Sequence, residues 1–196
     1  MRSLLTAAGS AVVMCASLAA SPLFAQTAPQ TITVTSPTLV AGQTMPKQHT
    51  PDGRNDSPAL SWSNVPAGTK EFIVICEDPE AGNPPPFVHW VIYKIPGSAK
   101  GLPEALPIDT ATPMPAGLEG AVQGLNGFRR PVYRGPAPPP GNPHPYHFVV
   151  YALDTALAAP KAGVPAMGRA ELLEAMKGHV LGQGELVAMY GRNRTQ

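Results

Sequence analysis

The sequence is poor in cysteine and in charge, and both shortages narrow the class of protein. Only two of its 196 residues are cysteines, Cys15 and Cys76, which excludes a scaffold held by several disulfides. Lys, Arg, Asp and Glu together make up 14% of the chain and the formal net charge is +1, so no basic surface for nucleic acid is expected. Hydrophobic residues reach 43%, unlike the composition of a disordered chain. We therefore expect a packed domain without a nucleic-acid partner.

Residues 1–25 have the pattern of a secretory signal peptide. Arg2 supplies the positive start, a weakly hydrophobic stretch follows, and the segment that ends at Ala25 resembles a processing site. The pattern predicts cleavage near Ala25 and a periplasmic or secreted protein that is not integral to a membrane. Cleavage would remove Cys15 and leave Cys76 without a partner inside the chain, so we expect a free thiol buried in an apolar strand.

Glycine and proline, by contrast, are abundant. Together they make up 44 of the 196 residues, about 22% where roughly 12% is ordinary, which excludes a helical bundle. A helical apolar pattern is confined to Arg169–His179. The segments with strand patterns are Ile32–Val34, Glu71–Glu77, Val88–Ile95, His147–Leu153 and Glu185–Tyr190. Residues 26–35 are predicted to form a short leader and the first strand, and residues 36–196 a single, mainly β domain with a C-terminal helix.

Proline-rich connections interrupt the predicted strands. Sixteen of the 25 prolines lie between Pro79 and Pro145, where their fixed φ angles favour ordered loops. Polar residues at the junctions of strands and loops are informative, because burying a polar group without a partner costs free energy. Four such residues are Asp78, His89, His144 and Tyr146. If their strands are neighbours, these side chains line one pocket, in which imidazole and phenol groups donate to a small anion and Asp78 orients a histidine.

Several motifs of catalysis and metal binding are missing. The sequence has no Gly-x-Ser-x-Gly nucleophile elbow, no glycine-rich loop of the P-loop or dinucleotide type and no His-Glu-x-x-His. His144 and His147 have a His-x-x-His spacing, but on a strand they point to opposite faces, so no metal site is expected. The sequence favours a non-catalytic protein that needs no cofactor. An alternative is an enzyme that uses either a bound metal or His89 and His144 as acid and base.

Eight short motifs together resemble one known family. They are Ser57–Trp62, Val65–Thr69, Asp78–Ala81, His89–Tyr93, Gly124–Gly127, Tyr133–Pro136, His144–Tyr146 and Tyr151–Asp154. In this order and spacing they resemble the phosphatidylethanolamine-binding protein (PEBP) family, in particular its bacterial branch, also called Raf kinase inhibitor-like. The resemblance runs from about Ser36 to Arg192.

The resemblance implies a PEBP-like fold, in which a large central antiparallel sheet packs on a smaller sheet and a helix lies near the C-terminus. It also implies a pocket for phosphate, a phosphoethanolamine head group or a similar anion. The ligand-binding residues implied by the matching motifs are Asp78, His89, Gly135, Pro136, His144 and Tyr146, with Pro79, Glu80 and Arg134 at the rim. If the histidines donate to the anion, its affinity rises as the pH falls through roughly 6.5, the ordinary pKa of histidine.

Two departures from the family's usual motifs affect the charge near this pocket. Glu80 stands where the family usually has a shorter Asp, and its longer carboxylate would repel an anion. Pro145 stands where the family usually has Arg, which removes a positive charge and a backbone N–H. The leading interpretation is an exported protein that binds a small anionic or phosphate-bearing ligand, compatible with contact to membrane head groups. The alternative is an inhibitor that presents the proline-stiffened loop 136–145 to a secreted hydrolase.

Overall fold

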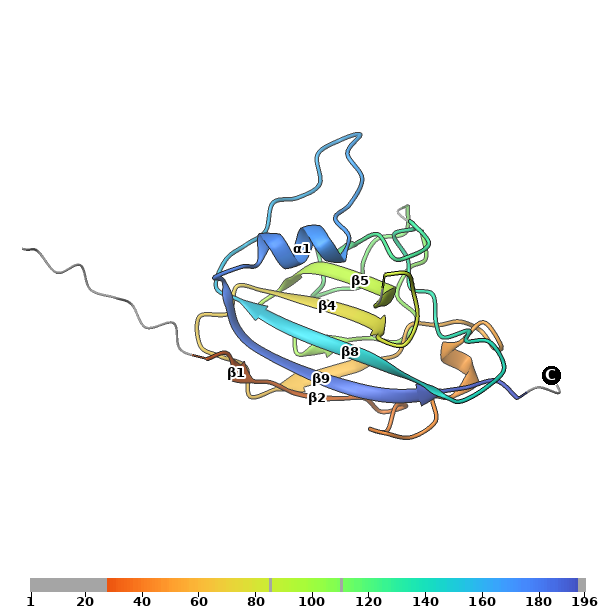
Figure 1. The fold of residues 1–196 in the computed structure, drawn as a ribbon. Helices are drawn as coiled ribbons and strands as arrows, with labels where there is room; N and C mark the ends of the chain where they lie inside the picture. Colours follow the sequence, from red (N-terminus) through yellow and green to blue (C-terminus); the bar gives the residue numbers. More distant parts are fainter. Residues whose placement is uncertain (1–27, 85, 110, 194–196) are drawn as a thin grey trace, which may run out of the picture.

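The structure is a computed structural model that describes residues 28–84, 86–109 and 111–193; the expected signal peptide, residues 1–25, lies outside these residues. Its larger sheet has six strands in the order β1 (Gln30–Thr31), β9 (Val180–Tyr190), β8 (His144–Leu153), β4 (Glu71–Asp78), β5 (Phe87–Pro96) and β7 (Val122–Gln123). All neighbours in this sheet pair antiparallel except β1 and β9, which are parallel. The expectation of a large, mainly antiparallel sheet is therefore confirmed (Figure 1).

A smaller antiparallel sheet packs against the larger one. It has three strands in the order β2 (Thr33–Thr35), β3 (Leu60–Ser63) and β6 (Gly101–Leu102). A short 3-10 helix, η1 (Lys47–His49), lies between β2 and β3 in the chain. One α-helix, α1 (Arg169–Ala175), comes late in the chain, as expected, and lies near β4 and β5 in Figure 1.

Strand β4 lies at the centre because both of its faces are apolar. Phe72, Val74 and Cys76 belong to the core between the two sheets, whereas Ile73 and Ile75 belong to a second core under α1. The alternation follows from the period of two of a strand. Strand β5 divides in the same way, which confirms the prediction that Val88–Ile95 is covered on both sides.

Some element boundaries differ from the sequence prediction. The helix ends at Ala175 instead of His179, and a turn with Gly178 at a φ of 77° follows. Strand β8 begins at His144 and β9 at Val180, both earlier than expected, because the two strands pair along almost their whole length. Gly184 allows this pairing beside the N-terminal segment, since a Cβ there would lie 1.9 Å from the carbonyl oxygen of Ile32.

Within the residues that the structure describes, no helix is long and apolar enough to cross a membrane.

Candidate functional site

The four polar residues singled out from the sequence lie together in one pocket. Asp78 ends β4, His89 lies on β5, and His144 and Tyr146 lie at the start of β8. Because β4 is antiparallel to both neighbours, its end lies beside the beginnings of β5 and β8. The pocket has a volume of about 190 Å³. Its remaining lining residues are Ala81, Phe87, Phe128, Ala137, Pro138 and Pro139.

Asp78 is the buried acceptor of the pocket. Its side chain is 2% exposed, and one carboxylate oxygen lies 2.8 Å from Nδ1 of His144. The other oxygen accepts the backbone N–H of Glu80 at 2.9 Å. A carboxylate accepts in both contacts, so His144 carries a hydrogen on Nδ1 and keeps Nε2 as its remaining polar atom.

Tyr146 is a fixed donor beside Asp78. Burial, reinforced by the charge of Asp78 and a hydrogen bond to it, raises the pKa of the Tyr146 hydroxyl well above its usual range. The hydroxyl therefore stays protonated at any physiological pH. Its ring also meets the ring of His89 edge to face, with centroids 5.2 Å apart.

His89 is buried and has a defined tautomer. Its Nδ1 lies 2.8 Å from the backbone carbonyl oxygen of Arg134, so Nδ1 carries the hydrogen and Nε2 is the ring nitrogen without one. Burial lowers the pKa of His89, against the opposing effects of the Arg134 carbonyl and Asp78. At neutral pH its Nε2 therefore accepts a hydrogen bond and does not donate one. The pH at which His89 becomes a donor lies below the value of 6.5 expected from the sequence.

Gly135 and Pro136 are buried in the loop behind the pocket but are not among the residues that line it. The backbone N–H of Gly135 donates to Oδ1 of Asn55 at 2.9 Å. A Cβ on Gly135 would lie 1.9 Å from the carbonyl oxygen of His49. The glycine therefore permits a close approach between two loops, where the sequence suggested an approach to the ligand.

The expected rim residues lie at the surface. Pro79 and Glu80 are exposed, and Glu80 contacts the site through its backbone N–H to Asp78. Arg134 is also exposed, and its guanidinium lies 4.6 Å from the ring centre of Phe128. Phe128 lines the pocket and also contacts Phe87. Sequence reasoning missed this apolar wall because neither phenylalanine stands out in the local pattern.

A larger cavity of about 600 Å³ lies beside β7. Its lining is mostly apolar, and the titratable residues that line it are Asp109 and Glu119. The pocket of Asp78 is smaller, but it gathers a carboxylate, two imidazoles and a phenol, so it is the better candidate for specific recognition.

A metal centre has no basis in the described part of the chain. No group of three or more His, Cys, Asp and Glu side chains there is placed to hold a metal ion. His144 contacts Asp78 while His147 contacts Glu185 at 2.9 Å, so the two histidines have different partners.

Comparisons with known proteins agree with this architecture. The family model described as phosphatidylethanolamine-binding protein matches residues 35–191. A UPF0098 protein of Methanothermobacter thermautotrophicus is 43% identical over 148 residues, which cover 76% of this chain and 91% of the relative.

Two solved structures share the fold. YbcL of Escherichia coli, described as a new member of the mammalian PEBP family, has a TM-score of 0.71 and 32% identity, over 83% of this chain and 99% of that one. A putative PEBP homologue of Chlamydia trachomatis, CT736, has the same TM-score and 31% identity, over 84% and 99% of the two chains. The family match, the sheet order and the similar structures together establish that the chain belongs to the phosphatidylethanolamine-binding protein family.

Proposed function

We propose that this chain is an exported, non-catalytic binding protein whose pocket takes phosphate, a phosphoethanolamine head group or a similar small anion. The observation that carries the proposal is the convergence of His89 and His144 on one small cavity, each with Nδ1 already bonded and Nε2 remaining. A volume of about 190 Å³ suits a group of phosphate size, given that a water molecule occupies roughly 30 Å³ in the liquid.

Binding of the anion requires a proton. Neutral His89 presents a lone pair at Nε2, which repels an acceptor oxygen. The conflict is resolved when the imidazole gains a proton, because Nε2 then becomes a donor. The buried carboxylate of Asp78 also opposes an anion, although one of its oxygens already accepts the Nδ1–H of His144 at 2.8 Å. Affinity should therefore increase as the pH falls.

The lining of the pocket favours binding over catalysis. The described lining residues include no Ser, Thr or Cys, and the Asp78 carboxylate already accepts hydrogen bonds on both oxygens. A nucleophile paired with a base is therefore missing from this set. Steady hydrolysis of a phosphate monoester, lost on removal of His89, would instead support the acid–base enzyme.

One observation favours a second candidate, an inhibitor of a secreted hydrolase. Pro139, Pro140 and Pro143 are exposed in the loop that precedes β8. This loop is tied to the C-terminal segment, where Pro140 forms a bridge with Arg192 and the N–H of Gly141 donates to the Arg192 carbonyl at 3.2 Å. A stiff exposed loop loses little entropy on docking. Inhibition of a hydrolase that survives removal of His89 would favour this candidate.

Export and the contact with lipid head groups are parts of the same proposal. The support for export is the pattern of residues 1–25. The mass of the protein recovered from the periplasm or medium tests it, with a mature start near residue 26 as the expected result and an intact Met1 as the contrary one. Binding to phosphatidylethanolamine vesicles, compared with free phosphoethanolamine, tests whether a head group is reached in a bilayer.

Calorimetric titration with phosphate and with phosphoethanolamine tests the pocket itself. We expect binding that is stronger at pH 5.5 than at pH 8 in the wild type and is lost in His89→Ala. The matched control is His179→Ala, which removes a half-exposed histidine paired with Asp154 at the protein surface. Equal binding in all three proteins would place the anion elsewhere and contradict the proposal.

A further inference from the structure

A chain of hydrogen bonds connects the pocket to a loop that does not line it. The carbonyl of Arg134 accepts Nδ1–H of His89 at 2.8 Å. The N–H of Gly135, in the same planar peptide unit, donates to Oδ1 of Asn55 at 2.9 Å. Because the carbonyl and the N–H of a trans peptide point in opposite directions, the single Arg134–Gly135 peptide connects the side chain of Asn55 to that of His89. The N–H of Arg134 in turn donates to the carbonyl of His89 at 3.1 Å.

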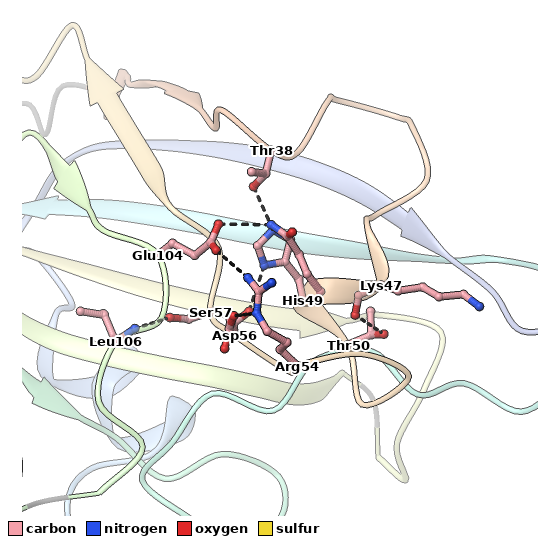
Figure 2. A network of polar contacts seen from close by, with 10 residues as sticks. Thr38, Lys47, His49, Thr50, Arg54, Asp56, Ser57, Glu104 and Leu106 are labelled. Atoms are coloured by element: carbon pink, nitrogen blue, oxygen red, sulfur yellow. Dashed lines mark hydrogen bonds and ion pairs between the residues drawn. The ribbon is translucent and has the colours of Figure 1, made fainter.

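The backbone around Asn55 is held in place from several sides. Asn55 has a φ of 62°, a left-handed conformation that Asn tolerates better than most residues. The adjacent carbonyl of Asp56 accepts Nδ1–H of fully buried His49 at 3.0 Å, and Nε2 of His49 accepts the hydroxyl of Thr38 at 2.9 Å (Figure 2). Arg54 adds ion pairs, to Asp56 at 2.6 Å among them. The amide of Asn55 is therefore presented to Gly135 by an ordered loop.

The two loops are also joined directly. The hydroxyl of Tyr133 donates to the carbonyl of His49 at 2.7 Å, and Gly135 packs on that same carbonyl. These contacts fix the distance between the Asn55 loop and the peptide that follows Arg134. A change of the Asn55 side chain thus acts on the peptide without a change of the surrounding contacts.

We propose that Asn55 is a positioning residue for the anion pocket, which acts through the Arg134–Gly135 peptide to keep hydrogen on Nδ1 of His89 and its Nε2 directed to the ligand. An acceptor on the N–H of a peptide polarises its carbonyl, and neighbouring hydrogen bonds strengthen each other by roughly 10–30%. Asn55 therefore strengthens the bond that orients His89. The relevance to ligand binding rests on the proposed function, but the effect on His89 does not.

His89 also faces other polar and charged groups, which set the background for any titration. Asp78 faces it from β4, Tyr146 and His144 belong to β8, and Arg134 lies on the loop. Burial lowers the pKa of His89, as does the charge of Arg134, whereas the backbone hydrogen bonds of Arg134 and Gly135 and the charge of Asp78 raise it. Asn55→Gly leaves all four residues in place and adds no charge, so a shift in this variant is assigned to the peptide.

Two substitutions at Asn55 have opposite expected effects. Asn55→Gly keeps the left-handed backbone and removes the acceptor, so the pKa of His89 should fall by about 0.2 to 0.6 unit. Asn55→Asp puts a charged acceptor at the same place, and charge-assisted bonds are roughly twice as strong, so the pKa should rise by about 0.5 to 1 unit. A loss of packing alone would not change sign between the two variants.

Asn64→Gly is the matched control. Asn64 also has a positive φ, of 56°, and its side chain donates to the carbonyl of Thr31 in β1, an edge strand that β9, β8 and β4 separate from β5. Removal of this side chain should leave the titration of His89 unchanged. Thermal unfolding of each variant checks that the fold is retained.

The measurement is a titration of the imidazole resonances of the ligand-free full-length protein by ¹⁵N–¹H NMR. The inference is supported if the pKa of His89 shifts in opposite directions in the two Asn55 variants. The Nδ1–H tautomer should be present in the wild type and retained in Asn64→Gly. An identical pKa of His89 in the wild type and both Asn55 variants would overturn it. Phosphate titration of the same samples is a separate readout: if Asn55 shifts His89 but phosphate does not bind, the inference holds and the proposed function fails. If phosphate binds, affinity at pH 7 should fall about 1.5- to 4-fold in Asn55→Gly.

Discussion

Substitution of Gly135 by Ala tests whether this glycine is required for packing between two loops. The new Cβ would lie 1.9 Å from the carbonyl oxygen of His49 and 3.0 Å from the Cα of Thr50. An ordinary carbon–oxygen contact is about 3.3 Å or longer, so the loops must separate by more than an ångström. Neither atom belongs to a flexible side chain, and relief therefore requires movement of the backbone.

The cost has two parts. Overpacking of this kind typically costs about 1–3 kcal/mol, and separation of the loops also weakens the hydrogen bond from Gly135 to Asn55, which contributes about 0.5–1.5 kcal/mol. We expect the free energy of unfolding to fall by about 2–4 kcal/mol in total. For a domain of this size the melting temperature should fall by about 4–16 °C.

Urea unfolding followed by circular dichroism measures this change, with Gly141→Ala as the matched control. Gly141 lies in the following part of the loop, and a Cβ there would meet only the Pro139 carbonyl oxygen, at 4.0 Å. A Gly135→Ala variant within about 0.5 kcal/mol of Gly141→Ala would refute the packing role of this glycine.

Three further predictions concern groups outside the pocket. Glu71 accepts Nζ of Lys94 at 3.1 Å and the N–H of Leu157 at 2.7 Å, so Glu71→Ala should lower the free energy of unfolding by about 2–4 kcal/mol in urea titrations, and a loss below 1 kcal/mol would contradict the account. Burial raises the pKa of the fully buried Cys76 thiol, so a thiol reagent should label Cys76 far more slowly in the native protein than in urea; equal rates at Cys76 would place this thiol at the surface. Hydrogen bonds from Arg192 and Tyr190 lower the pKa of Asp52 to about 2, so this partly exposed carboxylate should contribute about 1 kcal/mol to stability at pH 7, which is lost as the pH falls from 4 towards 2. The difference in unfolding free energy between wild type and Asp52→Asn should therefore be larger at pH 7 than at pH 2, and an equal difference at the two pH values would contradict this reasoning.

The sequence predicted the long strands whose two faces are both apolar, but only some of the short ones. Glu71–Glu77 and Val88–Ile95 are recognisable because burial on both sides demands apolar residues throughout. The two-residue strand β6 and the four-residue strand β3 were not predicted, because they have too few residues for an alternating pattern. They form because neighbouring strands offer them backbone partners, and these pairings depend on the tertiary structure.

The same distinction applies to the site. Asp78, His89 and His144 were recognisable because each is a titratable residue at the end of an apolar strand. Asn55 had no such signal, since it lies between Arg54 and Asp56 in a polar turn. Its contact with Gly135 joins residues 80 positions apart, and only the packing of two loops brings them together.

Gly135 shows where a resemblance between sequences needs the structure. The motif implied a pocket residue, and the glycine does lie in the loop behind the pocket. Its N–H, however, is already bonded to Asn55, and its missing side chain is explained by the His49 carbonyl. A ligand is therefore not needed to account for a glycine at this position.

In the proposed mode of binding, the pocket takes up a proton together with its anion. Calorimetric titration of phosphate near pH 7, repeated in buffers with different enthalpies of ionisation, measures the number of protons taken up on binding. Because His89 is neutral in the free protein, the account predicts uptake of about one proton per phosphate in the wild type and a marked reduction in His89→Ala. Phosphate binding without net proton uptake, equal in both proteins, would contradict it.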